Sequence, residues 1–230
     1  MLAVMGAMEE EIALFREAMD DVKKNQKAGL TFYQGKIDGK KIILVHCGIG
    51  KVNAAICTQI LIDDYGVDNI IFTGVAGALA ASLDVLDVVV STDCIQHDLN
   101  VHAFGYEPGT VPRLNKKEFA ADDALVQLAL ESGKNIEGFP QIIQGRILSG
   151  DEFIADKDRA LNLADEFNGH CVEMEGAAVA QACYLNNIPF VIIRAMSDKA
   201  DGTADVDFPK FVQKAANNSL ALVREMLKNL

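Results

Sequence analysis

The stretch from His170 to Gly202 reads HCVEMEGAAVAQACYLNNIPFVIIRAMSDKADG and contains two apolar runs separated by a segment of small residues. The small residues after the first run have helical composition, and Asn186 and Asn187 end the predicted helix. The second run continues from Pro189 to Ile193. Strand, helix and strand in this order predict a βαβ unit with a parallel pair and a right-handed crossover. The sequence therefore predicts an α/β fold.

Charged residues follow both predicted strands of this stretch. Glu175 comes just after the first strand, and Arg194 and Asp198 come after the second. In open α/β sheets, ligands bind outside the carboxyl ends of the strands, so these three side chains are expected in one site. A buried arginine also needs a partner, and the carboxylates are candidates. The alternative is that the acids only favour the helix dipole or cap turns.

Length and composition exclude several classes of protein. The 230 residues are half hydrophobic, which is enough for one domain, 1–230, with a large core. Five scattered cysteines without a CxxC pair are typical of reduced thiols in the cytoplasm. A net charge of −12 argues against nucleic-acid binding. No apolar run reaches the length of a membrane span, and no signal peptide is evident. We therefore expect a soluble cytoplasmic protein.

Strand-like and helix-like segments alternate along the rest of the chain. Asp38-Gly39 is a strong hairpin signal between two of the strands. Three acids, Glu9 to Glu11, open the first helix, and only one of them can readily point back over the preceding strand. Further strands are predicted at 2–5, 31–37, 40–45, 69–73, 87–95 and 141–148, and helices at 9–19, 51–65, 117–132 and 155–167 and from near Pro209 to the end.

One loop and one long segment lack regular periodicity. Gly48 and Gly50 match neither G-x-G-x-x-G nor the P-loop, so backbone approach to a ligand or helix is favoured over nucleotide-phosphate binding. The irregular segment 96–114 is long enough to predict a functional region or an interface. Its two histidines, His97 and His102, lack a supporting ligand motif, so we expect no metal ion. Nothing else in the sequence predicts a cofactor.

Short motifs in one fixed order cover essentially the whole chain. They are Gly6-Ala7-Met8-Glu9-Glu10-Glu11, Gly48-Ile49-Gly50-Lys51-Val52, Thr73-Gly74-Val75-Ala76-Gly77, Ala103-Phe104-Gly105-Tyr106, Ser149-Gly150-Asp151, Val172-Glu173-Met174-Glu175 and Ser197-Asp198. The chain resembles bacterial 5′-methylthioadenosine/S-adenosylhomocysteine nucleosidases of the purine nucleoside phosphorylase superfamily. This resemblance implies a nucleoside phosphorylase-like, three-layer α/β/α domain with a mixed, partly barrel-like sheet. It also implies a homodimer that hydrolyses the N-glycosidic bond of these nucleosides and releases adenine, as in methionine salvage.

The resemblance also implies roles for individual residues. Asp198, held by Ser197, would protonate N7 of adenine, and Glu11 would be the base that positions the attacking water. Glu175 would bind the ribose hydroxyls, and Arg194 would order the water and the carboxylates. The other implied substrate contacts are Phe153 and Ile154 at adenine, Glu173 and Met174 at the ribose, Val75, Ala76 and Gly77 on a strand end, Ile49 and Phe208 at the 5′-alkylthio group, and Val101, Phe104, Tyr106 and Pro112 from the partner subunit.

Two motifs depart from the usual family pattern, at three positions. Val75 stands where the family usually has serine, which removes a hydroxyl near the ribose or the water. Gly176-Ala177 replaces the commoner Ala-Thr after the second glutamate. Neither change removes a group with an expected catalytic role. The effect of Val75 on rate and substrate preference is left open by the sequence.

The chemistry of such a reaction requires acids in different states. Adenine is a poor leaving group as an anion, so an acid must neutralise it while the ribosyl carbon becomes cation-like and a positioned water captures that carbon. One carboxyl must be protonated and another ionised at the same pH. We expect Asp198, after Met196 on an apolar strand, to be the protonated acid and Glu11 to be the ionised base.

Two other functions are compatible with the same resemblance. A phosphorolytic relative would use phosphate in place of water and would need cationic groups for it. The acids Glu9 to Glu11, with no arginine before Arg16, disfavour phosphate. A non-catalytic adenosine-binding module on the same fold is the second alternative. Methylthioadenosine, S-adenosylhomocysteine, 5′-deoxyadenosine and futalosine-type nucleosides remain open as substrates.

Overall fold

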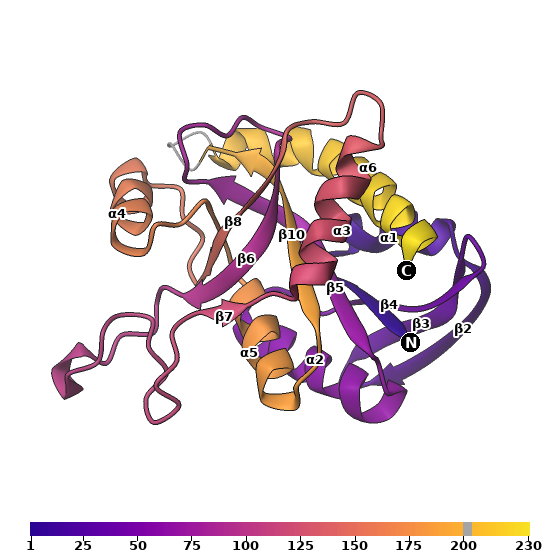
Figure 1. Cartoon of the computed structure of the whole chain (residues 1–230), viewed down its shortest axis with the longest axis horizontal. Helices are drawn as coiled ribbons and strands as arrows, with labels where there is room; N and C mark the ends of the chain where they lie inside the picture. The colour runs from indigo at the N-terminus through magenta and orange to yellow at the C-terminus, as the bar shows by residue number, and fades with distance from the viewer. Residues whose placement is uncertain (200–203) are drawn as a thin grey trace.

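Ten strands form a single mixed sheet in the part of the chain that the structure describes (Figure 1). The computed structural model describes residues 1–199 and 204–230, and it describes side chains for 1–199 and 211–230. The strands are β1 (Leu2–Gly6), β2 (Asp20–Lys27), β3 (Leu30–Ile37), β4 (Lys40–His46), β5 (Asn69–Ala78), β6 (Val88–Gln96), β7 (Phe119–Ala120), β8 (Ile142–Ser149), β9 (Cys171–Glu173) and β10 (Phe190–Asp198). The helices are α1 (Glu9–Glu17), α2 (Lys51–Tyr65), the short 3₁₀ helix η1 (His102–Phe104), α3 (Asp123–Lys134), α4 (Lys157–Phe167), α5 (Gly176–Asn186) and α6 (Ala204–Asn229).

Part of the sheet closes into a ring. The strand order is β10-β6-β8-β9-β5-β1-β4-β3-β2, and β10 also pairs with β5. The five strands from β10 to β5 therefore enclose a small barrel, and β1, β4, β3 and β2 extend it as an open sheet. Parallel pairs such as β1–β5 and antiparallel pairs such as β3–β4 both occur. The expectation of a mixed, partly barrel-like sheet is confirmed.

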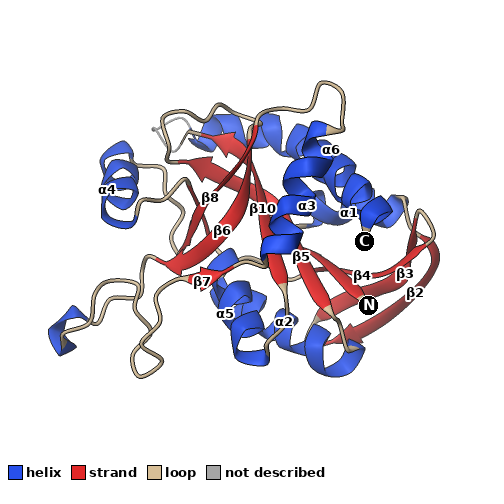
Figure 2. Cartoon of the chain, viewed as in Figure 1, coloured by secondary structure: helices blue, strands red, loops and turns tan. Residues whose placement is uncertain are grey.

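Helices cover both faces of the sheet, as Figure 2 shows. Alternate residues of β1 enter different cores, because successive side chains of a strand point to opposite faces. Ala3 and Met5 pack with α2 and α5, whereas Leu2 and Val4 pack with α1, α3 and α6. The predicted three-layer α/β/α architecture is therefore confirmed. Among the described helices, none is long and apolar enough to cross a membrane.

The predicted parallel pair of the opening stretch is wrong. β9 and β10 flank α5 as expected, but they are not neighbours in the sheet. β9 pairs antiparallel with Gly77 and Ala78 of β5, beyond the end of β1, whereas β10 pairs parallel with β5 from Ile70 onward. The right-handed crossover rule applies to two parallel strands of one sheet, and closure of the barrel separates these two strands.

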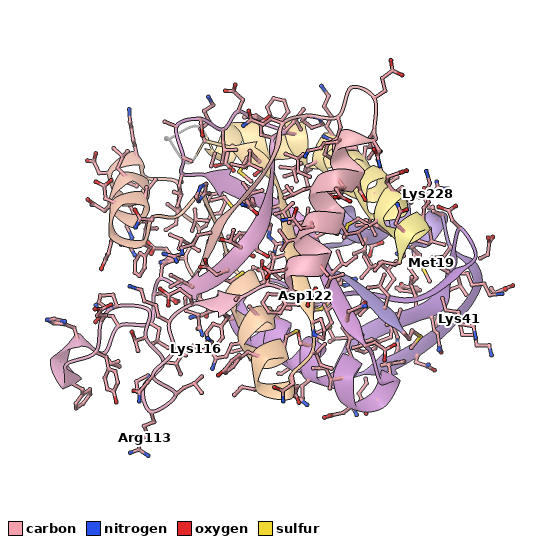
Figure 3. All side chains as sticks on the ribbon, viewed as in Figure 1. Met19, Lys41, Arg113, Lys116, Asp122 and Lys228 are labelled. Carbon is pink, nitrogen blue, oxygen red and sulfur yellow. The ribbon has the colours of Figure 1, made fainter. Side chains whose placement is uncertain are left out.

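Several element boundaries also differ from the sequence predictions. β2 was not predicted, because all of its residues are exposed and it has no apolar alternation. The helix predicted from Lys117 begins at Asp123, after the short strand β7, and the carboxylate of Asp122 accepts the Leu125 N–H as its cap (Figure 3). Helix α6 begins at Ala204, before Pro209. Polar edge strands and two-residue strands leave too little pattern in the sequence to be predicted.

The hairpin between β3 and β4 is confirmed at the predicted position. Ile37 is paired with Lys40, and the two residues between them are Asp38 and Gly39. Their φ angles are 48° and 80°, so both occupy the left-handed region that a two-residue type I′ turn requires. Asp-Gly is favoured there because aspartate tolerates this region and glycine adopts it without steric cost.

Candidate active site

A cavity of about 290 Å³ lies where β1, β5, β9 and β10 end near the start of α2. Most of the residues expected from the sequence line it together. These are Glu11, Ile49, Val75, Ala76, Gly77, Phe153, Ile154, Glu173, Met174, Glu175, Ser197 and Asp198. Ala7, Met8, Glu152 and Val172 also line it and were not predicted, although each lies within or beside one of the quoted motifs.

Glu11 is the one acid of the first helical turn that points back over β1. One oxygen of its carboxylate accepts the backbone N–H groups of Ala7 and Met8, at 2.6 and 3.0 Å, and the other accepts that of Val75 at 3.0 Å. A Cβ on Gly74 would lie 2.6 Å from Glu11 Oε1, so only glycine fits at that position. Burial raises the pKa of Glu11, while the charge of Arg194 and the three N–H donors oppose the shift. A raised pKa makes the ionised carboxylate a stronger base.

Arg194 lies behind the pocket lining as a fully buried cation. It is only 1% exposed, its guanidinium donates to Glu173 from Nε at 3.1 Å and from Nη2, and it stacks on the Phe72 ring at 4.1 Å. Burial alone would lower the pKa of Arg194, but the carboxylates of Glu173, Glu11 and Glu175 together outweigh it and raise the pKa above its ordinary value. Arg194 therefore stays charged and interacts favourably with all three carboxylates.

Glu173 uses its carboxylate mainly to hold protein groups. It accepts the backbone N–H groups of Glu175 and Gly176 at the start of α5, and it also contacts Ser149 Oγ. Ser149 Oγ in turn accepts the Ala177 N–H at 2.7 Å. An acid at this position also interacts favourably with the helix dipole. The expected ribose contact of Glu173 stays a prediction, since the residue reaches the pocket wall with its hydrogen bonds already committed.

Glu175 has few partners and faces the cavity. One of its oxygens accepts the Gly50 N–H at 2.8 Å. Burial, together with the nearby charge of Glu173, raises the pKa of Glu175 to about 8. Gly50 has φ +96°, a conformation that other residues rarely adopt. The backbone at Gly50 is therefore specialised to direct its N–H at this carboxylate.

Ser197 and Asp198 reach the same cavity because β10 contains a bulge. Met196 is paired with Ala76 and Asp198 with Gly77, so Ser197 is an extra residue in the strand. In a regular strand consecutive side chains point to opposite faces, and a bulge redirects one of them. Both side chains consequently line the pocket, and Ser197 Oγ donates to Asp198 Oδ2 at 2.7 Å.

Other predicted residues lie away from the pocket of this chain. The segment that follows β6, here called the arm (residues 97–118), projects from the body of the molecule and has Arg113 near its tip (Figures 1 and 3). The arm carries Val101, Phe104, Tyr106 and Pro112, of which Phe104 is 81% exposed. Phe208 lies outside the described side chains. Within the described residues, no cluster of three or more His, Cys, Asp or Glu side chains could hold a metal ion.

Comparison with known proteins identifies the family. A family model for the phosphorylase superfamily matches residues 1–228, which agrees with the barrel-containing sheet and the acidic pocket. A 5′-methylthioadenosine/S-adenosylhomocysteine nucleosidase from Anoxybacillus flavithermus is 44% identical over 230 residues, which is all of this chain and 98% of that protein. The chain therefore belongs to the phosphorylase superfamily and, within it, to the family of these nucleosidases.

Solved structures give the same result. The nucleosidase from Neisseria meningitidis, in complex with methylthio-immucillin-A, has a TM-score of 0.95 and 43% identity, with 100% of this chain and 99% of that chain covered. A futalosine hydrolase from Helicobacter pylori has a TM-score of 0.94 and 33% identity, with 100% and 97% covered. The fold is therefore shared by enzymes with different named substrates.

The raised pKa of Glu175 predicts a pH-dependent stability difference. Between the ordinary pKa of a glutamate and about 8, the folded protein keeps a proton on Glu175 that the unfolded chain releases. The free energy of unfolding should therefore fall as pH rises through this window. Glu175→Gln removes this loss, so its melting temperature relative to wild type should increase from pH 5 to pH 8 and then level off.

Thermal unfolding of both proteins across pH 5–9 measures this difference. Glu166→Gln, at an exposed position on α4, is the control and should show a constant offset from wild type. A pH-independent offset for Glu175→Gln would contradict the assigned environment of Glu175.

Proposed function

We propose that the protein hydrolyses the N-glycosidic bond of 5′-methylthioadenosine and S-adenosylhomocysteine, releasing adenine and the corresponding 5′-thioribose. One observation supports this most strongly: three buried carboxylates, Glu11, Glu175 and Asp198, line one cavity. The relatives named above support the choice of nucleosides. In this set Asp198 supplies a proton to the leaving base, and an ionised carboxylate such as Glu11 stabilises the ribosyl cation.

Hydrolysis is favoured over phosphorolysis by the charges of the pocket. Among the described residues that line it, none is a lysine, arginine or histidine. Phosphate recognition depends on cationic or other strong donors, and the acids here would repel a dianion. The buried Arg194 is already engaged with Glu173, so it does not supply a free phosphate site. Water is therefore the nucleophile that this pocket accommodates.

The proposed reaction uses each acid once. Asp198 gives its proton to N7 of adenine, and the C1′–N9 bond breaks with its electron pair going to the base, which leaves as neutral adenine. Glu175 holds the ribose hydroxyls close to the developing cation. Glu11 accepts a proton from water as the water oxygen bonds to C1′. Exchange with solvent then returns a proton to Asp198 and removes one from Glu11.

The walls of the pocket suit an adenosine thioether. Phe153 and Ile154 both line the cavity. We assign the Phe153 ring to stacking on the base and the Ile154 backbone to hydrogen bonds with its edge. Ile49 and Met174 supply an apolar lining for the ribose and the 5′-alkylthio group. At Val75 the backbone N–H, not a side-chain hydroxyl, meets Glu11. The water is consequently oriented by the carboxylate of Glu11 without help from a residue-75 hydroxyl.

A homodimer completes this proposal. Ile49, Val52 and Ile56 near and on α2 are exposed apolar residues at helical spacing, and Phe104 is exposed on the arm. Exposed apolar clusters of this kind mark association surfaces. A partner subunit would bring its own Val101, Phe104, Tyr106 and Pro112 to the 5′ side of the pocket.

All five cysteines are buried and unpaired, which suits the reducing cytoplasm.

Product analysis distinguishes the possible reactions. The protein is incubated with 5′-methylthioadenosine, with and without inorganic phosphate, and the products are separated by chromatography. We expect adenine and free methylthioribose at rates that do not depend on phosphate. A sugar phosphate that forms only with phosphate would establish phosphorolysis, and tight binding without turnover would establish a binding module.

Asp198→Asn tests the assignment of the acid. The amide keeps the size of the side chain but has no acidic proton to deliver to N7. General acid catalysis contributes about 10²- to 10⁴-fold, so kcat should fall at least about 100-fold. Adenine release under saturating 5′-methylthioadenosine measures this, and a variant with more than about a tenth of wild-type activity would refute the assignment.

Glu11→Gln tests the assignment of the base against a neighbour on the same helix. Glutamine keeps one acceptor oxygen for the backbone N–H groups that donate to Glu11 and does not take a proton from water, so kcat should fall at least about 100-fold. Glu10→Gln is the matched control, because Glu10 is exposed in the same first turn of α1. Equal losses in the two variants would show that general acidity of the loop, and not the position of Glu11, supports the reaction.

A further inference from the structure

Three segments that are distant in the sequence form a closed ring of hydrogen bonds beside the pocket. The Lys51 N–H donates to Asp151 Oδ1 at 2.9 Å, and the Asp151 N–H donates to Asp98 Oδ2 at 3.0 Å. The ring closes where Lys51 Nζ donates to Asp98 Oδ1 at 2.6 Å. We call these three residues the clasp. It joins the first residue of α2, the segment just after β6 and the loop after β8.

The clasp is directly connected to two walls of the pocket. Gly50, which precedes Lys51, donates its N–H to Glu175, and a Cβ at Gly50 would lie 3.1 Å from Asp151 Oδ1. Asp151 also lies two residues before Phe153, in the loop that carries the expected adenine contacts. Displacement of Asp151 would therefore move both the Gly50 N–H that donates to Glu175 and the loop at Phe153 that is expected to contact adenine.

Neighbouring residues brace the clasp from two sides. Gln96 Oε1 accepts a second hydrogen bond from Lys51 Nζ at 3.1 Å, and Gln96 Nε2 donates to Gln181 on α5. The ring of His97 packs against Gly150, where a Cβ would lie 2.4 Å from Nε2, so a larger residue does not fit. The clasp is thus tied to the helix that begins just after Glu175.

Stability alone gives little reason for this arrangement. The side chains of Lys51 and Asp98 are 17% and 26% exposed, and ion pairs that reach solvent contribute about 0–1 kcal/mol. Burial alone would raise the pKa of Asp98, but the hydrogen bonds from Lys51 and from the Asp151 N–H outweigh it and bring the pKa below its ordinary value. Asp98 is therefore ionised at neutral pH. A charged group that contributes little stability yet joins three loops is suited to set their relative positions.

We propose that Asp98 is a positioning residue that acts through Gly50 to orient Glu175 toward the ribose hydroxyls. The proposal rests on the proposed nucleosidase function. It assigns a role to a residue outside the pocket lining, at the base of the arm. Through the clasp, the position of the base of the arm affects the orientation of Glu175, the carboxylate that binds the sugar.

Asp98→Asn is the direct test. One amide oxygen replaces two carboxylate oxygens, so either Lys51 Nζ or the Asp151 N–H loses its acceptor on residue 98. Small displacements of a binding group reduce rates by up to about 10²-fold, and we expect kcat/KM for 5′-methylthioadenosine to fall about tenfold or more. With the 2′-deoxy form of this substrate, part of the Glu175 contact is already absent, so the loss should be clearly smaller.

Asp93→Asn is the matched control. Asp93 lies on β6 and pairs with Arg146 at 2.7 Å, and the two side chains are 17% and 24% exposed, much like the clasp pair. Its partner does not line the pocket. This variant should keep wild-type kcat/KM for both substrates within about threefold while losing a similar, small amount of thermal stability.

The outcomes separate the clasp from the proposed function. A larger loss for the ribose substrate than for its 2′-deoxy form in Asp98→Asn, with little loss in Asp93→Asn, supports the clasp. Wild-type activity in Asp98→Asn, or equal losses for both substrates, overturns it. If Asp98→Asn does not fold, Lys51→Gln removes the Nζ hydrogen bonds to Asp98 and Gln96 but keeps the Lys51 N–H bond to Asp151, and it must show the same substrate dependence. No adenine release by the wild type would refute the proposed function and the clasp with it.

Discussion

The buried ion pair between Arg194 and Glu173 is the interaction on which the rest of the site depends. Removing one partner of such a pair leaves an uncompensated charge and costs about 3–5 kcal/mol. Glu173 is itself held by the first N–H groups of α5 and contacts Ser149, so the pair joins β10, β8 and α5. Glu11 and Glu175 face the same guanidinium. One cation therefore lies close to three buried carboxyl groups, those of Glu173, Glu11 and Glu175.

The number and kind of partners explain why the pKa values of the buried acids differ. Arg194 and three N–H donors partly offset the effect of burial on the pKa of Glu11, whereas burial and the nearby charge of Glu173 raise the pKa of Glu175, which accepts the Gly50 N–H, to about 8. Below a pH of about 8 the raised pKa keeps a proton on Glu175, which limits the repulsion among the buried acids. A substrate that becomes positively charged is attracted by the carboxylates that remain ionised, whereas a phosphate dianion is repelled by them. The charges that disfavour phosphate are therefore the charges that favour a cation-like transition state.

The sequence predicted those features that local chemistry determines. Asp38-Gly39 adopts the predicted hairpin turn because both residues tolerate positive φ. Glu11 points back over β1 because α1 begins shortly after the end of β1. The relation between β9 and β10 was not predictable, since it depends on barrel closure, a long-range property. The bulge at Ser197 was also hidden, because a bulge arises from pairing register and leaves no apolar pattern. Motif order identified Asp198 and Ser197, but only the structure explains how two consecutive residues reach one cavity.

The acids of the cavity and the loops that form its walls are held in place by different parts of the structure. Asp198 and Arg194 belong to a buried central strand, and Glu11 is fixed by three backbone donors, so these groups are held by the core. Ile49, Gly50 and Phe153 lie on loops, and the clasp, not the core, sets the distance between those loops. The proposed acid Asp198 is thereby placed on a strand and the proposed base Glu11 on a helix, whereas the expected contacts to the substrate at Ile49 and Phe153 are placed on loops. Because one partly exposed ion pair joins these loops, a substitution at Lys51 or Asp98 is expected to shift them without changing Glu11 or Asp198.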